Sequence, residues 1–195
     1  MLVKIIAGCK ISTPKMQFLN VRLSGFLGKK VIGVIIDFLF ERLRVYGENV
    51  LFNITKGDKN NGVAIHKPGR RVWCIDGDGA ALMHMGAMAV IGSCRPENLV
   101  HVIINNGAHE TVGGMPTAAG AIDFVQIALA CGYTRGGSVS DFEALDAALE
   151  EAKGGKGPIL IEVKCGIGAR EDLGRPTAAA IENKRNFMEY LAALE

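Results

Sequence analysis

The feature that most constrains the fold is a direct strand-turn-helix pattern that includes the stretch CIDGDGAALMHMGAMAVIG, residues 74–92. Residues 72–75 form a short apolar run that stops at Gly77, which predicts a buried strand. Residues 80–92 are apolar on all sides, which predicts a buried helix. Only the acidic turn of residues 76–79 separates the two, so the chain passes straight from the end of a strand into a helix.

The same alternation continues towards the C-terminus. Residues 99–104 and 158–163 predict strands, and residues 122–131, 140–153 and 177–194 predict helices. Gly132 is a natural helix stop, and Ser140 with Glu143 forms a capping box for the next helix. Residues 107–120 are rich in glycine and predict a loop. We therefore predict the α/β class, with a doubly wound, mostly parallel sheet that carries helices on both faces.

The N-terminal third has a different character. Residues 1–73 carry 13 Lys/Arg against 4 Asp/Glu, whereas residues 74–195 carry 9 Lys/Arg against 16 Asp/Glu. We predict an atypical, partly disordered segment over residues 1–69 and one domain over residues 70–195. Within the first segment the pattern is consistent with strands at 30–36 and 49–54, a helix at 38–45, and a polar loop or poorly ordered link at 56–69.

Composition argues against several classes of function. The basic charges are dispersed and lie in no nucleic-acid-binding motif, so we expect no nucleic-acid partner. Residues 31–40 are apolar but too short to cross a bilayer, and Lys4 interrupts the N-terminal apolar run, so we expect a cytoplasmic protein without a membrane partner. The five cysteines form no C-x-x-C pair, which indicates reduced thiols.

The acidic turn has a plain interpretation, in which acidic residues favour the start of a helix. It fits neither common glycine-rich motif, because Leu82 breaks a dinucleotide fingerprint, and Ala81 and Ala87 break an EF-hand loop. Its position at the carboxyl end of a strand is where doubly wound sheets bind ligands.

The next strand ends in Asn105-Asn106, with 25 residues between Gly79 and Asn105. This interval fits one helix, one turn and one strand, so Asp78 and Asn106 are expected at the same edge of adjacent strands. The pair predicts a magnesium site, and the amides of Gly79 and Ala80 are suited to a phosphate. An ordinary Asn-Gly turn is the alternative for this segment.

The order GDG, 25 residues and NN resembles the motif of the thiamine-diphosphate-dependent decarboxylase superfamily. NNGAHETVGGMPT and DLGRPT resemble segments of the phosphonopyruvate decarboxylase family in particular, and the likeness covers residues 70–195. It implies thiamine diphosphate and Mg²⁺ as cofactors. The cofactor would serve as the electron sink for loss of CO2 from a 2-oxo acid, most simply phosphonopyruvate, which would give phosphonoacetaldehyde.

The resemblance also implies roles for individual residues. The metal ligands would be the side chains of Asp78 and Asn106 and the carbonyl of Ala108; the diphosphate would contact Gly77, Gly79 and Ala80; and His109 and Glu110 would face the reacting end of the cofactor. Arg170 and Arg175 are weaker candidates for the substrate anion, with a surface or interdomain ion pair as the alternative.

The family also needs a glutamate from a pyrimidine-binding domain, which the first 70 residues do not resemble. We therefore expect a pyrimidine-binding domain or subunit as a partner, in an oligomer. A sulfopyruvate decarboxylase-type subunit and a truncated, non-catalytic binding module are the alternatives.

Overall fold

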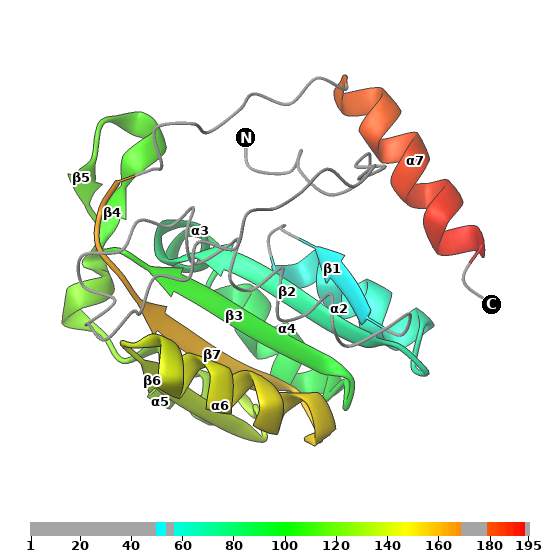
Figure 1. The fold of residues 1–195 in the computed structure, drawn as a ribbon, viewed down its shortest axis with the longest axis horizontal. Helices are drawn as coiled ribbons and strands as arrows, with labels where there is room; N and C mark the ends of the chain where they lie inside the picture. Colours follow the sequence, from blue (N-terminus) through cyan, green and yellow to red (C-terminus); the bar gives the residue numbers. More distant parts are fainter. Residues whose placement is uncertain (1–49, 54–56, 169–178, 194–195) are drawn as a thin grey trace.

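A five-stranded parallel sheet forms the centre of the protein (Figure 1). The computed structural model describes residues 50–53, 57–168 and 179–193. In sequence order the strands are β1 (Val50–Asn53), β2 (Arg71–Gly77), β3 (Leu99–Asn105), β6 (Arg135–Val139) and β7 (Ile159–Lys164). In space the order is β1-β2-β3-β7-β6, and every neighbouring pair is parallel. The predicted α/β class with a mostly parallel sheet is confirmed.

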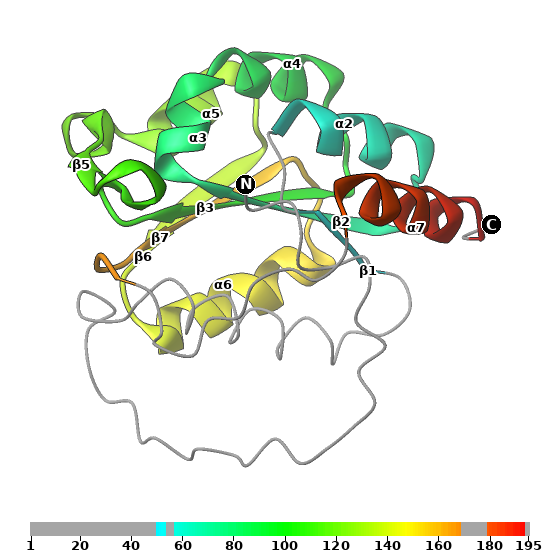
Figure 2. The same ribbon diagram turned by 90° about the horizontal axis from the view of Figure 1, so that it is seen from above.

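Helices cover both faces of this sheet (Figure 2). One face carries α2 (Gly57–His66), α3 (Asp78–Met83), α4 (Gly86–Cys94) and α5 (Phe124–Cys131), and the other carries α6 (Phe142–Gly154). Each face has its own hydrophobic core. Trp73 belongs to the core under α6, and its neighbour Val72 belongs to the core under α4 and α5. This alternation follows from the strand geometry, in which successive side chains point to opposite faces.

The three helices predicted at 122–131, 140–153 and 177–194 are present, with ends shifted by up to three residues. Asp123 caps α5 by accepting a hydrogen bond from the Gln126 amide at 3.0 Å, and Gly132 ends α5 with a left-handed φ of 105°. The predicted cap at Ser140 is wrong, because Asp141 caps α6 by accepting from the Ala144 amide at 2.8 Å. A final helix, α7, spans Ala180–Ala193.

Two further predictions along the chain are wrong. The predicted loop at 56–69 contains α2, whose Asn61 and Ala64 are buried although the segment lacks an apolar stripe. The single predicted helix at 80–92 is two helices, because His84 leaves the helical region with φ −127° and ψ 35° between α3 and α4. Met83, just before this break, is 66% exposed.

The N-terminal segment contributes to the same sheet. Within the predicted strand at 49–54, residues 50–53 form β1, which pairs in parallel with β2. The strand expected at 30–36 and the helix expected at 38–45 lie outside the described residues. The boundary near residue 70 stays a prediction. No helix in the described part of the chain is long and apolar enough to cross a membrane.

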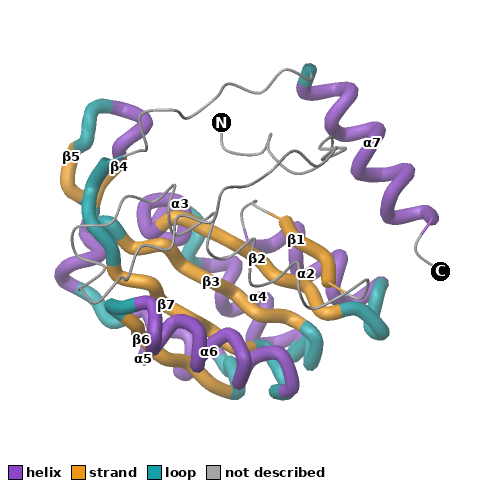
Figure 3. The backbone as a smooth tube through the Cα atoms, in the orientation of Figure 1, coloured by secondary structure: helices purple, strands orange, loops and turns teal. Residues whose placement is uncertain are grey.

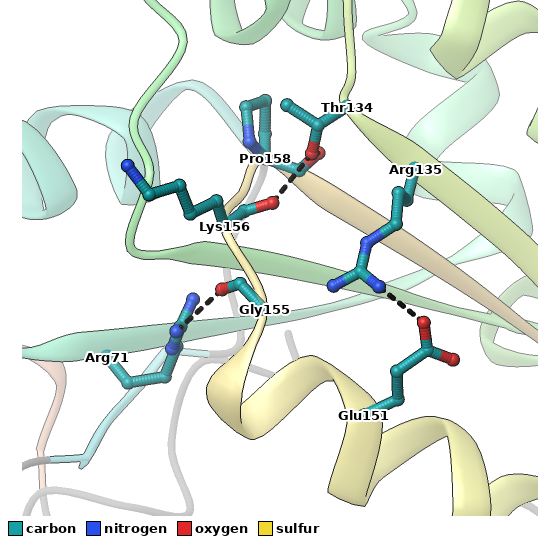
Figure 4. A network of polar contacts seen from close by, with 7 residues as sticks. All are labelled: Arg71, Thr134, Arg135, Glu151, Gly155, Lys156 and Pro158. Atoms are coloured by element: carbon teal, nitrogen blue, oxygen red, sulfur yellow. Dashed lines mark hydrogen bonds and ion pairs between the residues drawn. The ribbon is translucent and has the colours of Figure 1, made fainter.

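Arginine side chains at the amino ends of β2 and β6 contact the C-terminal part of α6 (Figure 4). The Arg71 guanidinium donates to the carbonyl of Lys153 at 3.1 Å and to that of Gly155 at 2.8 Å. It thereby satisfies carbonyls at the C-terminal end of α6, where a positive charge is also favourable. Arg135 forms an ion pair with Glu151 on the same helix. These contacts hold one end of the sheet, while the carboxyl ends of the strands carry the candidate site.

Candidate functional site

The two strands that carry the predicted metal ligands are direct neighbours. Gly77, the last residue of β2, is in register with Ile104 of β3. Asp78 therefore follows one strand and Asn106 follows the next at the same edge of the sheet. Both side chains are buried, with 2% of Asp78 and 8% of Asn106 exposed. Burial of a carboxylate and a carboxamide at a sheet edge is costly unless their polar atoms have partners.

Thr117 joins the two strand ends. Its hydroxyl donates to Asp78 Oδ2 at 2.5 Å, and its backbone amide donates to the carbonyl of Gly107 at 2.9 Å. Thr117 reaches this position because β4 (Ala108–His109) and β5 (Met115–Pro116) pair as a short antiparallel ribbon at one end of the sheet (Figure 3). The segment expected to be a plain loop is thus partly ordered, with one-turn helices at Glu110–Val112 and Ala118–Ala121.

Asn106 is held by hydrogen bonds on both sides of its carboxamide. Its Nδ2 donates to Glu110 Oε2 at 2.7 Å, and its Oδ1 accepts from the Ala108 amide at 3.1 Å. The other carboxylate oxygen of Glu110, Oε1, accepts from the Gly168 amide at 2.5 Å. Both oxygens of Glu110 are therefore engaged with protein groups.

Gly79 lies directly against His109. A Cβ atom at Gly79 would lie 2.5 Å from His109 Nδ1 and 2.6 Å from its Cε1. Real carbon contacts are not that short, so the imidazole occupies the space that any side chain at this position would need. Gly79 is buried, Ala80 is partly exposed and Gly77 is exposed. Gly77 is therefore the most solvent-exposed residue of this turn.

Cys165 lies within electrostatic range of both acidic groups of the site, Asp78 and Glu110. Burial raises the pKa of its thiol to about 12, with further contributions from the negative charges of Asp78 and Glu110. Its backbone amide donates to the carbonyl of Asn105 at 2.9 Å, which places Cys165 beside the end of β3. The thiol stays protonated near neutral pH and adds no charge to the site.

Three buried polar side chains, Asp76, His101 and Tyr133, lie next to the acidic turn. Asp76 accepts a hydrogen bond from the Gly77 amide at 3.1 Å, and its Oδ2 lies 3.8 Å from His101 Nε2. His101 Nδ1 shares a 3.0 Å hydrogen bond with the hydroxyl of Tyr133. Burial is the main cause that raises the pKa of Tyr133. Asp76 thus lies close to the buried His101, whereas Asp78 accepts a hydrogen bond from Thr117 in the neighbouring loop.

A family model described as "Thiamine pyrophosphate enzyme, C-terminal TPP binding domain" matches residues 60–163, more than half of the chain. The chain belongs to this family. The match begins inside α2 and ends in β7, so it includes β2, β3 and the loop that carries Thr117.

Relatives of this TPP-binding domain include phosphonopyruvate decarboxylases. That of Streptomyces viridochromogenes is 38% identical over 130 residues, which is 67% of this chain and 32% of the relative. That of Streptomyces hygroscopicus is 40% identical over 129 residues, with 66% and 32% covered. The chain thus spans about a third of the length of these relatives. The sulfopyruvate decarboxylase subunit beta of Methanococcus maripaludis is 26% identical, with 60% of this chain and 73% of that subunit covered.

The fold has a counterpart among solved structures. The thiamine diphosphate-dependent 4-hydroxybenzoylformate decarboxylase of Rhodococcus jostii RHA1 superposes with a TM-score of 0.55 at 20% identity, covering 67% of this chain and 32% of that one. At this identity the likeness concerns the fold of the TPP-binding domain.

The donor groups of this TPP-binding domain fit a hard divalent cation. Asp78 supplies a carboxylate and Asn106 a carboxamide, and Mg²⁺ prefers such oxygen ligands, with water and phosphate oxygens completing its shell. In the described ranges no group of three or more His, Cys, Asp or Glu side chains is placed to hold a metal. A cation at this edge would therefore rely on amide, carbonyl and phosphate oxygens besides Asp78. Arg170 and Arg175 lie outside the described residues.

Sequence reasoning missed three residues of the site: Thr117, Cys165 and Gly168. Thr117 closes the family-like segment NNGAHETVGGMPT, which was the one available signal for it. The other two reach the site through the pairing of β3 with β7, a long-range contact that the sequence does not show directly. A cavity of about 300 Å³ beside β6 and β7 has none of the predicted site residues in its lining, which consists of Ile122, Asp123, Val125, Ser138, Glu162 and Lys164.

Proposed function

We propose that this domain binds the diphosphate end of thiamine diphosphate through a magnesium ion, as half of a 2-oxo acid decarboxylase. The observation that carries the proposal is the meeting of Asp78 and Asn106 at adjacent ends of parallel strands, where Thr117 links the two loops. That edge is where doubly wound sheets bind ligands. The oxygen chemistry of the two side chains suits magnesium bridged to phosphate.

In this proposal the side chains of Asp78 and Asn106 and the carbonyl of Ala108 hold the cation. Gly77, Gly79 and Ala80 contact the diphosphate through the backbone. A Cβ at Gly79 would collide with His109, so this position offers a ligand only its backbone amide. When bound, thiamine diphosphate supplies an electron sink for the loss of CO2 from a 2-oxo acid.

His109 and Glu110 follow the metal-binding segment directly, and we assign them to the side on which the substrate reacts. His109 is partly exposed and packs against Gly79, beside the turn that we assign to the diphosphate. Glu110 differs, because both of its oxygens already accept hydrogen bonds from the protein.

Phosphonopyruvate is the favoured substrate, because phosphonopyruvate decarboxylases are 38% and 40% identical to this chain over about two thirds of its length. Sulfopyruvate is the second candidate, since the matched relative from Methanococcus maripaludis is a subunit, and 73% of its length is covered by this chain. Either reaction needs a pyrimidine-binding domain or subunit as partner, within an oligomer.

The test is release of CO2 from phosphonopyruvate, sulfopyruvate and pyruvate, measured with and without a pyrimidine-binding partner in the presence of Mg²⁺ and thiamine diphosphate. We expect turnover of phosphonopyruvate when the partner is present, and loss of that turnover in Asp78→Ala. Preference for sulfopyruvate would support the second candidate. Cofactor binding without turnover of any 2-oxo acid would contradict the enzymatic proposal and favour a non-catalytic binding module.

A further inference from the structure

Two consecutive asparagines at the end of β3 are each paired with a glutamate. Asn105 Nδ2 donates to Glu162 Oε1 at 2.7 Å, and Asn106 Nδ2 donates to Glu110 Oε2 at 2.7 Å. The two pairs have the same chemistry and the same distance. They differ in that the resemblance assigns a metal-binding role to Asn106 but not to Asn105.

A carboxylate determines which way a carboxamide faces. An ionised glutamate only accepts hydrogen bonds, so the atom that contacts it must be the NH2 group of the asparagine. Rotating the Asn106 carboxamide by half a turn would replace this hydrogen bond by a contact between two oxygens. Glu110 therefore keeps Oδ1 of Asn106 on the side away from its own carboxylate, where Oδ1 accepts from the Ala108 amide.

Glu110 is itself fixed by a segment distant in sequence. Its Oε1 accepts from the amide of Gly168, a residue with φ 129° that follows β7. An ordinary side chain at position 168 would strain that backbone conformation. Glu110 thus connects the end of β3 to the segment beyond β7, and its carboxylate cannot turn away from Asn106 without losing the contact with Gly168.

We propose that Glu110 is a positioning residue that orients the Asn106 carboxamide so that its oxygen faces the divalent cation. The inference rests on the proposed function, because it takes Asn106 as a metal ligand. Residues that orient metal ligands in this way typically change metal affinity 10- to 100-fold when they are replaced.

The experiment uses the full chain in excess thiamine diphosphate, with its pyrimidine-binding partner where wild type needs one. Melting temperature is followed as Mg²⁺ is titrated, and the Mg²⁺ concentration at half-maximal stabilisation is compared between variants. For Glu110→Gln we expect a roughly 10- to 100-fold increase in this concentration, because the new amide no longer selects one orientation of Asn106. The matched control is Glu162→Gln, which removes the same charge beside Asn105 and should leave the midpoint unchanged.

A double variant provides the rescue. In Asn106→Asp combined with Glu110→Gln, the new carboxylate presents an oxygen to the cation in either orientation, and its other oxygen can accept a hydrogen bond donated by the new glutamine. We expect the double variant to recover a midpoint near that of wild type, even if Glu110→Gln alone does not fold.

Three outcomes are informative. An unchanged midpoint in Glu110→Gln with only a lower melting temperature would show a purely structural role and overturn the inference. A double variant that folds but does not regain Mg²⁺ response would also overturn it. If wild type itself shows no Mg²⁺-dependent stabilisation, the proposed function fails first, and the inference about Glu110 falls with it.

Discussion

The hydroxyl of Thr117 donates a 2.5 Å hydrogen bond to the buried carboxylate of Asp78, although 39 positions separate the two residues in the sequence. The same residue donates its backbone amide to the loop that follows β3. A single threonine thus places the end of β2 and the end of β3 in a fixed relation. This relation explains how two glycine-rich loops can present a defined set of oxygen ligands.

Replacing Thr117 by valine keeps the shape of the side chain and removes the hydroxyl. We expect the free energy of unfolding to fall by about 1–3 kcal/mol, because the buried Asp78 carboxylate loses a hydrogen-bond donor. Urea denaturation of the ligand-free chain measures this change. Thr117→Ser retains the hydroxyl, so its free energy of unfolding should fall less than that of Thr117→Val. An equal fall in the two variants would contradict a stabilising role of the hydrogen bond.

Gly79→Ala tests the contact between the acidic turn and His109. The new Cβ would displace the imidazole, which is the end of a movable side chain, so the free energy of unfolding should change by less than about 1 kcal/mol. Stabilisation by Mg²⁺ and thiamine diphosphate should be reduced, because the imidazole must move towards the ligand. Thermal melts with and without both ligands test this, and a wild-type response in the variant would contradict it.

Gly92→Ala is expected to damage the fold itself. A Cβ at Gly92 would lie 1.8 Å from the backbone carbonyl oxygen of Cys131, so α4 and α5 would have to separate. Backbone cannot yield as a side chain does, and we expect a loss of about 3 kcal/mol in urea denaturation. The control is Gly86→Ala in the same helix, where a Cβ has no neighbour within 4 Å and should stabilise by up to about 1 kcal/mol. Similar urea midpoints for Gly92→Ala and Gly86→Ala would contradict the close contact between α4 and α5.

Cys165 should react slowly with alkylating reagents despite its place beside the site. Its pKa is raised to about 12 by burial and by the charges of Asp78 and Glu110, so little thiolate exists at pH 8. We expect alkylation by iodoacetamide at least about tenfold slower than that of the exposed Cys94, as measured by mass spectrometry of the modified peptides. Equal rates at the two cysteines would be incompatible with this environment.

The same shift in pKa has a consequence for stability. The folded chain holds the Cys165 proton up to about pH 12, whereas the unfolded chain releases it near 9.0. Unfolding therefore releases a proton in this window, and the contribution of Cys165 to stability declines as pH rises from 9 to 12. Cys165→Ala should show a shallower loss of stability over that range than wild type, and identical pH profiles would contradict the assignment.

Much of the fold could be predicted from the sequence because its central strands are continuous apolar runs. β2, β3 and β7 are buried on both faces, and such strands are recognisable from composition alone. β6 was not predicted, since its sequence RGGSV has little apolar content and it lies at an edge of the sheet beside β7. Its Gly136 instead allows close approach to Val125 of α5.

The residues of the site that could be predicted are those placed by the order of strands in the sheet. Asp78 and Asn106 were expected at one edge because adjacent parallel strands end together, and the register of β2 with β3 places them there. Glu110 and Thr117 depend instead on how the loop after β3 folds back through the β4–β5 ribbon. Such long-range contacts leave no periodic signal in the sequence, which is why the hydrogen bonds of Asn106 and Asp78 emerged only from the structure.

The central claim is that Asp78 holds a magnesium ion bridged to thiamine diphosphate, and melting temperature in the presence of both ligands tests it most directly. The measurement compares wild type with Asp78→Ala and Asp78→Asn. The asparagine variant keeps an acceptor for the Thr117 hydroxyl but removes the charge. The control is Glu143→Ala on the exposed surface of α6. We predict that Mg²⁺ and thiamine diphosphate together, but neither alone, raise the melting temperature of wild type and Glu143→Ala, with the pyrimidine-binding partner present if wild type needs it. Neither Asp78 variant should respond. An equal response in wild type and Asp78→Asn, or no response in wild type with the partner present, would contradict the account.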